Sequence, residues 1–125
     1  MRRLVFYSTL LGLLTLGVWP GTAASPVFHI TIESAAPYYH PASATVTTGA
    51  TIRWENPTPA FHTVTHDGCL TTAGPCAFDS GAVAPNSSYS VPSLPPGRYP
   101  YHCQVHPIMR AVLVVTDPQA IPSPT

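Results

Sequence analysis

Three side chains that can bind a metal are separated by two residues each near the end of the chain: Cys103, His106 and Met109. A further histidine, His62, lies far upstream. Thiolate and thioether are soft donors that suit Cu(I), whereas imidazole binds copper in both oxidation states. A shell of two imidazoles, one thiolate and one weak axial thioether therefore lets copper change oxidation state without exchanging ligands. The residue types and spacing predict one mononuclear copper site.

Each of these residues has a simpler explanation when it is taken alone. A histidine such as His62 is often a hydrogen-bonded strand residue, and a methionine such as Met109 often fills a gap in a core. We prefer the copper interpretation because all of these explanations would have to coincide. A zinc-binding or metal-free β-sandwich used in adhesion is the structural alternative. Zinc is disfavoured because it prefers a fourth strong nitrogen, sulfur or oxygen donor to a thioether.

The composition favours one compact β domain. Of the 125 residues, 45% are hydrophobic and only 8% are charged, and the 16 prolines and 8 glycines argue against long helices. The chain contains no lysine, and its arginines are few and scattered. Binding to nucleic acid or to a membrane surface requires clustered positive charge. We therefore expect neither nucleic acid nor a membrane surface as a partner.

The first 24 residues resemble a secretory signal peptide. Arg2 and Arg3 precede the apolar run Leu4–Trp19, and small residues follow as far as Ala24. The run is short for a membrane span. We therefore expect an exported protein, periplasmic or extracellular, with no membrane insertion after cleavage. Cleavage after Ala23 and an uncleaved N-terminal anchor remain alternatives.

Export bears on the three cysteines, because thiols tend to pair in an oxidising compartment. Cys69 and Cys76 flank a short loop with a Gly-Pro turn signal, so these two can form a disulfide. Cys103 is then the thiol left for a metal. The opposite pairing, Cys103 with either of the others, would remove the thiolate on which the copper site depends.

Short runs of β-type residues separated by turn signals follow the leader. They predict an all-β fold, a Greek-key antiparallel β-sandwich. The expected strands are residues 27–33, 44–48, 51–55, 62–66, 88–91, 98–102 and 110–116. Pro100 suggests that the strand at 98–102 is an edge or bulged strand. We expect the domain to span residues 25–117, and residues 118–125, rich in proline, to form a flexible tail.

From Pro41 to Thr116 the chain resembles cupredoxins of the plastocyanin and amicyanin kind. The resemblance is carried by two stretches, ATVTTGATIRWEN before the first histidine and PGRYPYHCQVHPIMR before the last strand. The short Cys-x2-His-x2-Met loop is of the amicyanin type. The resemblance implies a type 1 (blue) copper site with His62 and His106 as imidazole ligands, Cys103 as equatorial thiolate and Met109 as axial sulfur.

The resemblance also implies a function. We expect a monomer that shuttles single electrons between extracytoplasmic redox proteins, with a cytochrome, dehydrogenase or oxidase as donor and acceptor. We expect no enzymatic activity, because protein ligands fill the coordination shell and leave no open position for a substrate. A copper storage or delivery protein that uses the same ligands is the alternative.

Several residues near the predicted site are assigned supporting or surface roles. We expect Asn56 to tie the His62 loop to the loop around Cys103, and backbone amides to reach the thiolate sulfur. Phe61 and Ile108, with neighbouring Ala and Pro residues, can form an apolar docking surface, although both can equally be core residues. The remaining histidines are placed outside the ligand set: His29, His40, His66 and His102. Of these, His66 should lie on the same strand face as His62, and His102 should point away from Cys103.

Overall fold

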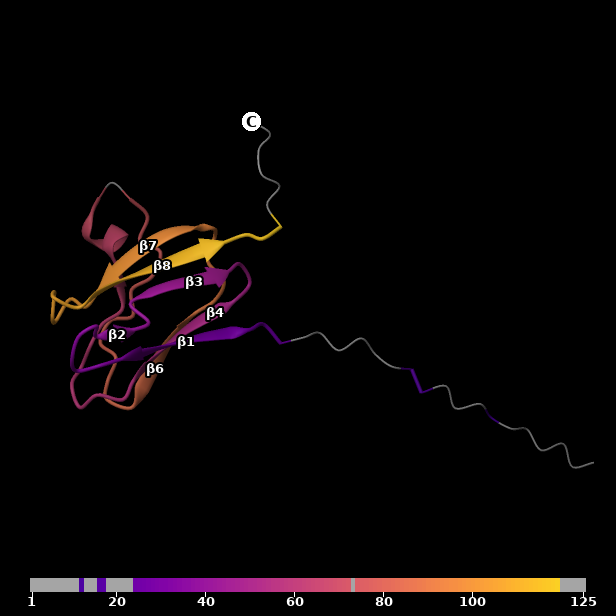
Figure 1. Ribbon diagram of the computed structural model, residues 1–125, viewed down its shortest axis with the longest axis horizontal. Coiled ribbons are helices and arrows are strands. Elements are labelled where there is room, and N and C mark those ends of the chain that lie inside the picture. The colour runs from indigo at the N-terminus through magenta and orange to yellow at the C-terminus, as the bar shows by residue number, and fades with distance from the viewer. Residues whose placement is uncertain (1–11, 13–15, 18–23, 73, 120–125) are drawn as a thin grey trace, which may run out of the picture.

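A computed structural model describes residues 12, 16–17, 24–72 and 74–119 of the chain. These residues form two four-stranded sheets packed face to face, with loops gathered at both ends (Figure 1). The only helical segment among them is one turn of 3-10 helix, η1 (Asp67–Leu70). The strands are β1 (Val27–Ile32), β2 (Tyr39–His40), β3 (Ser43–Thr47), β4 (Thr51–Asn56), β5 (Thr65–His66), β6 (Ser87–Val91), β7 (Gly97–His102) and β8 (Arg110–Thr116).

The two sheets are mixed rather than purely antiparallel. The first has the order β2-β1-β4-β6 and the second the order β3-β8-β7-β5. The all-β sandwich is confirmed, but two pairings are parallel, β1 with β4 and β3 with β8. The reason is visible in the chain order: between β1 and β4 the chain crosses to the other sheet as β3, and it returns running in the same direction.

The strands bury alternate side chains between the two sheets, as the period of two in a β-strand requires. In β4, Ile52, Trp54 and Asn56 are buried while the residues between them are more exposed. Trp54 lies at the centre of an aromatic cluster, and its indole N–H donates a hydrogen bond to the Tyr101 hydroxyl (3.2 Å). Gly49 turns the chain between β3 and β4 at φ +91°, a left-handed conformation that glycine adopts without strain.

Three expectations about the strands need correction. The two-residue strand β2 was not predicted, because a segment this short shows no alternation. Only Thr65 and His66 of the predicted strand 62–66 are regular, and His62 forms an isolated bridge with Val83. Strand β7 is not an edge strand, since β8 and β5 flank it. Pro100 is accommodated because β5 pairs only with Tyr101 and His102, beyond the proline.

The two ends of the sandwich carry different parts of the chain. At one end lie Glu33, which follows β1, the loop between β7 and β8, and the segment that leads into β5. At the other end, Val27 pairs beside Thr51, and Thr47 pairs with Thr116. Strands β1 and β8 therefore join the first end, which carries the predicted ligands, to a second end, where residues 24–26 enter β1 and residues 117–119 follow β8 (Figure 1).

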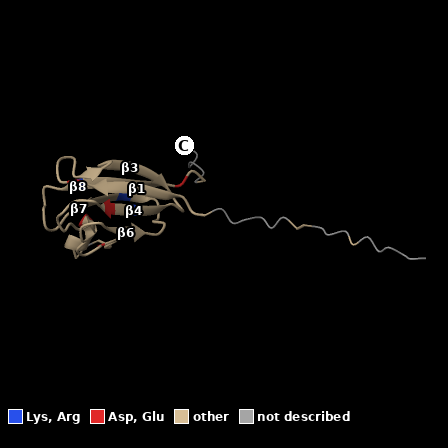
Figure 2. Cartoon of the chain, turned by 90° about the horizontal axis from the view of Figure 1, so that it is seen from below, with Lys and Arg blue, Asp and Glu red and all other residues tan. Residues whose placement is uncertain are grey.

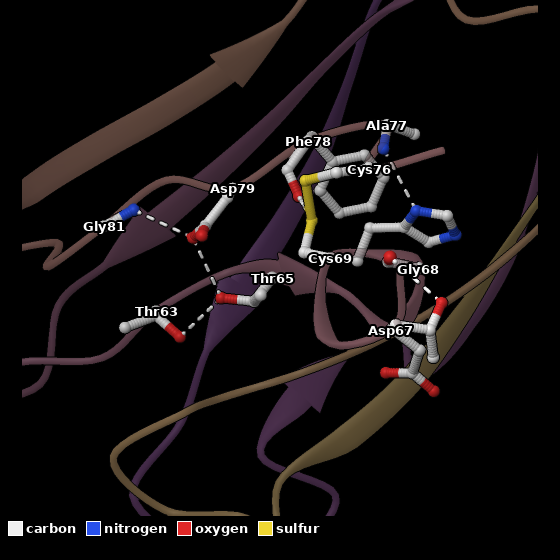
Figure 3. The surroundings of a disulfide bond; sticks show 12 residues. Thr63, Thr65, Asp67, Gly68, Cys69, Cys76, Ala77, Phe78, Asp79 and Gly81 are labelled. Atoms are coloured by element: carbon white, nitrogen blue, oxygen red, sulfur yellow. Dashed lines mark hydrogen bonds between the residues drawn. A yellow bond between two sulfur atoms is a disulfide. The ribbon is translucent and has the colours of Figure 1, made fainter. Parts of the chain in front are cut away.

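A disulfide joins Cys69 to Cys76, and Cys103 is a free, buried thiol. This confirms the pairing that leaves Cys103 available. The disulfide begins within η1 and closes residues 69–76 into a loop, and hydrogen bonds join the chain that follows this loop to β5 (Figure 3). The Ala77 N–H donates to His66 Nδ1 (3.1 Å), and the Asp79 carboxylate accepts a hydrogen bond from the Thr65 hydroxyl (3.1 Å).

Removing the disulfide should destabilise the fold without changing the predicted metal site. In the variant Cys69→Ala/Cys76→Ala we expect the free energy of unfolding to fall by about 2.5 kcal/mol, the chain-entropy value for a loop this short. Denaturant unfolding of the metal-free protein measures this loss. An unchanged unfolding midpoint would mean that the anchoring hydrogen bonds already order the loop.

The predicted leader, residues 1–24, and tail, residues 118–125, lie mostly outside the described residues. Within the described part of the chain, no helix has the length and apolar character needed to cross a membrane.

Candidate metal centre

Three of the four predicted ligands meet at one end of the sandwich. The donor atoms of His62, Cys103 and His106 all lie within 4.8 Å of one another. His62 comes from the segment before β5, whereas Cys103 directly follows β7 and His106 belongs to the loop that leads to β8. Cys103 is fully buried and His62 is 4% exposed, whereas His106 is only partly buried. The sheet pairing of β5 with β7 brings these distant parts of the sequence together.

The hydrogen bonds around His62 fix which ring nitrogen is free. The Asn56 carbonyl oxygen can only accept, so the Thr58 hydroxyl donates to it (2.7 Å). The Thr58 oxygen then accepts from His62 Nε2–H (2.9 Å), which leaves the lone pair on Nδ1. Nδ1 is buried and has no hydrogen-bond partner. A buried, unpartnered nitrogen next to a thiol is unusual in a satisfied core and fits a metal ligand.

A second set of hydrogen bonds holds the Cys103 sulfur. The Thr63 N–H donates to Cys103 Sγ (3.3 Å), which confirms that a backbone amide reaches this sulfur. The Thr63 hydroxyl oxygen accepts from the Gln104 N–H (2.8 Å). Thr63 therefore ties the His62 segment to the Cys103 loop from both its backbone and its side chain. Sequence reasoning missed this residue, because a threonine beside a histidine in a strand carries no local signal.

Asn56 does not make the tie that we expected of it. Its amide N–H groups donate to the Ala60 carbonyl (2.8 Å) and to the Val83 carbonyl (3.0 Å), and its carbonyl accepts from Thr58. Thr58 and Ala60 belong to the segment that carries His62, and Val83 lies in the segment that pairs with His62. None of these partners belongs to the loop around Cys103. Asn56 is fully buried and supports the site indirectly. It holds Thr58 in place, and Thr58 in turn accepts a hydrogen bond from the His62 ring.

Met109 is buried and joins the end of the loop to its beginning through backbone hydrogen bonds. It is 2% exposed and lines a cavity together with His62 and His106. Its backbone is fixed from two directions, because its carbonyl accepts from the Cys103 N–H (3.1 Å) and its N–H donates to the His106 carbonyl (2.9 Å). These two hydrogen bonds hold the backbone of the loop from Cys103 to Met109 in one closed conformation. Met109 lines the same cavity as His62 and His106, and its role as the axial donor stays a prediction.

The environment keeps the nearby groups in the forms that suit a metal site. Burial, and then the proximity of His106, lower the pKa of His62, so its ring is neutral as a metal ligand must be. Burial, and then the charge on Cys103, raise the pKa of Tyr39. Tyr39 therefore stays protonated, and it donates to the Thr63 carbonyl (2.7 Å). This bond supports the residue that holds the sulfur.

The other histidines lie outside this group. His102 points away from Cys103, as expected, and its Nδ1 lies 2.6 Å from the Asp67 carboxylate. His66 does not share the site with His62, because the strand between them is irregular. Its ring instead packs against Phe78 within the disulfide region. His29 lies near Glu55 on the surface, and His40 is exposed.

The surface around His106 is apolar. Phe61 is 55% exposed and Ile108 is 73% exposed, so the surface interpretation of both residues is confirmed and the core interpretation is wrong. Val105, which lies between Cys103 and His106 in the sequence, is also exposed, and we did not predict it as part of this surface. The cavity of about 270 Å³ lies beside Ile108 and is lined further by Glu33, Ser34, Tyr38, Ala60, His62, His106 and Met109.

A β-sandwich with a buried His-Cys-His group at one end fits the class of type 1 copper proteins. Amicyanins are among the solved structures that resemble this chain. They include a proline-to-glycine mutant in its reduced Cu(I) form at pH 4, with 28% identity and a TM-score of 0.62 over 75% of this chain and 86% of that chain. A methionine-to-alanine mutant in its Cu(I) form gives 28% identity and a TM-score of 0.62 over 76% and 86%.

The oxidised state of a proline-to-alanine mutant of amicyanin gives 27% identity and a TM-score of 0.62, over 75% of this chain and 86% of that chain. No family model and no curated protein matches the sequence. The resemblance to cupredoxins of the plastocyanin and amicyanin kind is therefore confirmed by fold and by site. The resemblance is clearer in the fold than in the sequence, because the sequence identity is modest.

Proposed function

We propose that this chain is a type 1 copper protein that carries single electrons between redox proteins outside the cytoplasm. The proposed ligands are His62 through Nδ1, Cys103 through its sulfur, His106, and Met109 as the weak axial donor. The observation that carries the proposal is the His62 ring, whose Nδ1 is buried and unpartnered and which offers a donor atom within 4.8 Å of those of Cys103 and His106. The solved neighbours contain Cu(I), which supports copper as the metal.

The donor set favours copper over zinc. Zinc prefers a fourth strong donor, whereas Met109 offers only a thioether. When bound, copper supplies a reversible one-electron change. The work of the protein is to hold the donors still, and Thr58, Thr63 and the closed 103–109 loop do this. Fixed ligands reduce the rearrangement that accompanies a change of oxidation state.

The arrangement suits a carrier rather than an enzyme. All proposed coordination positions are filled by protein side chains, and catalytic metal centres instead keep one position open for water or substrate. His106 is the least buried of the three clustered ligands, and exposed Phe61 and Ile108 flank the same end of the sandwich. A redox partner would approach there.

Docking at this end would be weak and brief, because the surface is small and carries few charges. Figure 2 shows charged residues as isolated segments on a mostly uncharged chain. Transient redox complexes bury little area, and rapid dissociation lets the carrier meet its next partner. We propose a cytochrome, dehydrogenase or oxidase as donor and acceptor, with this protein acting as a monomer.

Export is part of the proposal. Residues 1–24 have the composition of a secretory signal, which supports a mature domain at residues 25–117 in the periplasm or outside the cell. The Cys69–Cys76 disulfide supports the same conclusion, because disulfides persist in oxidising compartments.

The proposal is tested by adding Cu(II) to the purified protein and recording its visible and EPR spectra, followed by stopped-flow exchange with hexacyanoferrate. We expect one copper per chain, an intense thiolate-to-copper absorption band, and rapid oxidation and reduction. A colourless protein would contradict the type 1 site. Copper that leaves readily for a metal-free acceptor but does not exchange electrons would favour the storage or delivery alternative.

A further inference from the structure

A chain of hydrogen bonds connects an exposed carboxylate, that of Asp79, to the residue that follows Cys103. The Thr65 hydroxyl donates to the Asp79 carboxylate (3.1 Å). The hydroxyl oxygens of Thr65 and Thr63 lie 3.0 Å apart, and the Gln104 N–H donates to the Thr63 oxygen (2.8 Å). Figure 3 shows the part of this chain that runs from Asp79 to Thr63.

The carboxylate fixes the direction of every bond in the chain. An ionised carboxylate only accepts hydrogen bonds, so the single hydroxyl proton of Thr65 goes to Asp79. The Thr65 oxygen must then accept the proton of Thr63, and the Thr63 oxygen accepts from the Gln104 N–H. Hydrogen bonds linked in this way polarise one another, most strongly where water is excluded. Thr63 and Thr65 are 4% and 0% exposed, so the middle of the chain is shielded from water.

Asp79 is fixed opposite Thr65 although its side chain is exposed. The two residues form an isolated antiparallel bridge, and backbone hydrogen bonds join the residues on either side of each. The Asp79 carboxylate also accepts from the Gly81 N–H (3.2 Å), which restricts its rotation. The contact between Asp79 and Thr65 is therefore part of the folded structure and not a chance meeting of two flexible side chains.

Thr63 connects this chain to the sulfur. Its own N–H donates to Cys103 Sγ (3.3 Å), and its hydroxyl holds the amide of the next residue after Cys103. The hydroxyl proton of Thr63 has an acceptor in Thr65 because Asp79 takes the proton of Thr65. Hydrogen bonds around a ligating cysteine sulfur tune the reduction potential of a copper site.

We propose that Asp79 and Thr65 are positioning residues that set the reduction potential of the metal site through Thr63. The inference rests on the proposed copper function and adds two residues outside the ligand set. Negative charge relayed toward the thiolate favours Cu(II) over Cu(I), so the intact chain keeps the potential low. The hydrogen bonds must carry the effect, because water and salt screen the charge of an exposed carboxylate.

The experiment is a double-mutant cycle on the full chain, with Asp79→Asn, Thr65→Val and the two combined. Asp79→Asn removes the charge and keeps the shape, and Thr65→Val replaces the hydroxyl with a methyl group. Thr65→Ser keeps the hydroxyl and is the conservative control. Asp117→Asn removes the same charge beyond the end of β8. Redox titration of the copper-loaded protein gives the potential. NMR of the metal-free protein gives the Gln104 amide proton shift and its hydrogen-exchange rate.

We expect Asp79→Asn to raise the potential by about 30 mV, which is about threefold in the equilibrium constant for one-electron exchange. Thr65→Val should raise it by a similar amount. In the Thr65→Val background, Asp79→Asn should add almost nothing, because the link is already broken. The Gln104 amide of each variant should exchange faster and shift upfield, since its hydrogen bond weakens. Thr65→Ser and Asp117→Asn should resemble the wild type in both measurements.

An equal change of potential for Asp79→Asn with and without the Thr65 hydroxyl would mean that the charge acts through space, and the inference would be overturned. A Gln104 amide that Thr65→Val leaves unchanged would overturn it as well. If Thr65→Val does not fold, Asp79→Asn alone decides, because an unchanged Gln104 amide in this exposed variant has the same meaning.

These failures are distinguishable from failure of the proposed function. A wild type with an intense copper band and rapid electron exchange keeps the function, whatever the cycle shows. A wild type without that band would reject the function and the tuning role with it, even if the amide measurements follow the expected pattern.

Discussion

Replacing Cys103 with serine should abolish the intense visible band of the Cu(II) protein and weaken copper binding by more than the 10- to 100-fold expected for loss of a supporting residue. A serine hydroxyl does not ionise at neutral pH and is a hard donor, so the soft thiolate bond is lost. The fold should survive, because serine is slightly smaller and its oxygen can still accept from the Thr63 N–H. Absorption and EPR spectra, with copper analysis after dialysis, measure the change.

The matched control for this change is the double variant Cys69→Ala/Cys76→Ala. It also removes sulfur atoms, but they belong to the disulfide and not to the His-Cys-His group. Its spectrum should equal that of the wild type. An intense band that persists in Cys103→Ser would mean that Cys103 is not the thiolate ligand, and the type 1 assignment would be wrong.

The second large effect is expected for Asn56→Ala. The substitution removes an acceptor for Thr58 and two donors, and it leaves the Ala60 and Val83 carbonyls with weaker partners. A buried polar group left unsatisfied costs about 1–3 kcal/mol. We expect the free energy of unfolding to fall by about 2–4 kcal/mol, and the reduction potential or copper affinity to change, since Thr58 no longer holds the His62 ring. Denaturant unfolding and redox titration measure these effects.

Two further variants separate the parts of this network. Thr58→Val removes only the hydroxyl that accepts from His62 Nε2, so it should alter the copper spectrum more than the stability. Asn56→Asp keeps the acceptor for Thr58 and loses the two donors. It should lower stability more than it alters the spectrum. If both variants change the spectrum equally, Asn56 does not act through Thr58.

The candidate ligands could be proposed from sequence because their chemistry is specific and three of them are close in sequence. Cys103, His106 and Met109 form one compact loop, so their spacing already restricts their geometry. The supporting residues could not be found in this way. Thr58 and Thr63 acquire their roles from hydrogen bonds to atoms that only the folded chain brings near, and Asn56 was assigned the wrong partner for the same reason.

The fold was predictable at the level of strands and less so at the level of pairing. Alternation identified β1 and β4, because one face of each is buried, and a run of apolar, mostly β-branched residues identified β8. The parallel pairings depend on which sheet each strand joins, and no local pattern records that choice. Pro100 is an example. A proline in a strand suggests an edge strand, but β7 is flanked on both sides because β5 pairs with it only beyond Pro100, and the sequence does not show where β5 ends.

Strands β1 and β8 both join the end that carries His106 to the opposite end, where Val27 and Thr116 lie. A linker attached before Val27 or after Thr116 would therefore hold the domain by the end that lies opposite His106. Fixed to an electrode through such a linker, the protein would present its histidine edge to the solution and not to the conductor. Efficient current would then require attachment through an engineered cysteine near Ile108 instead.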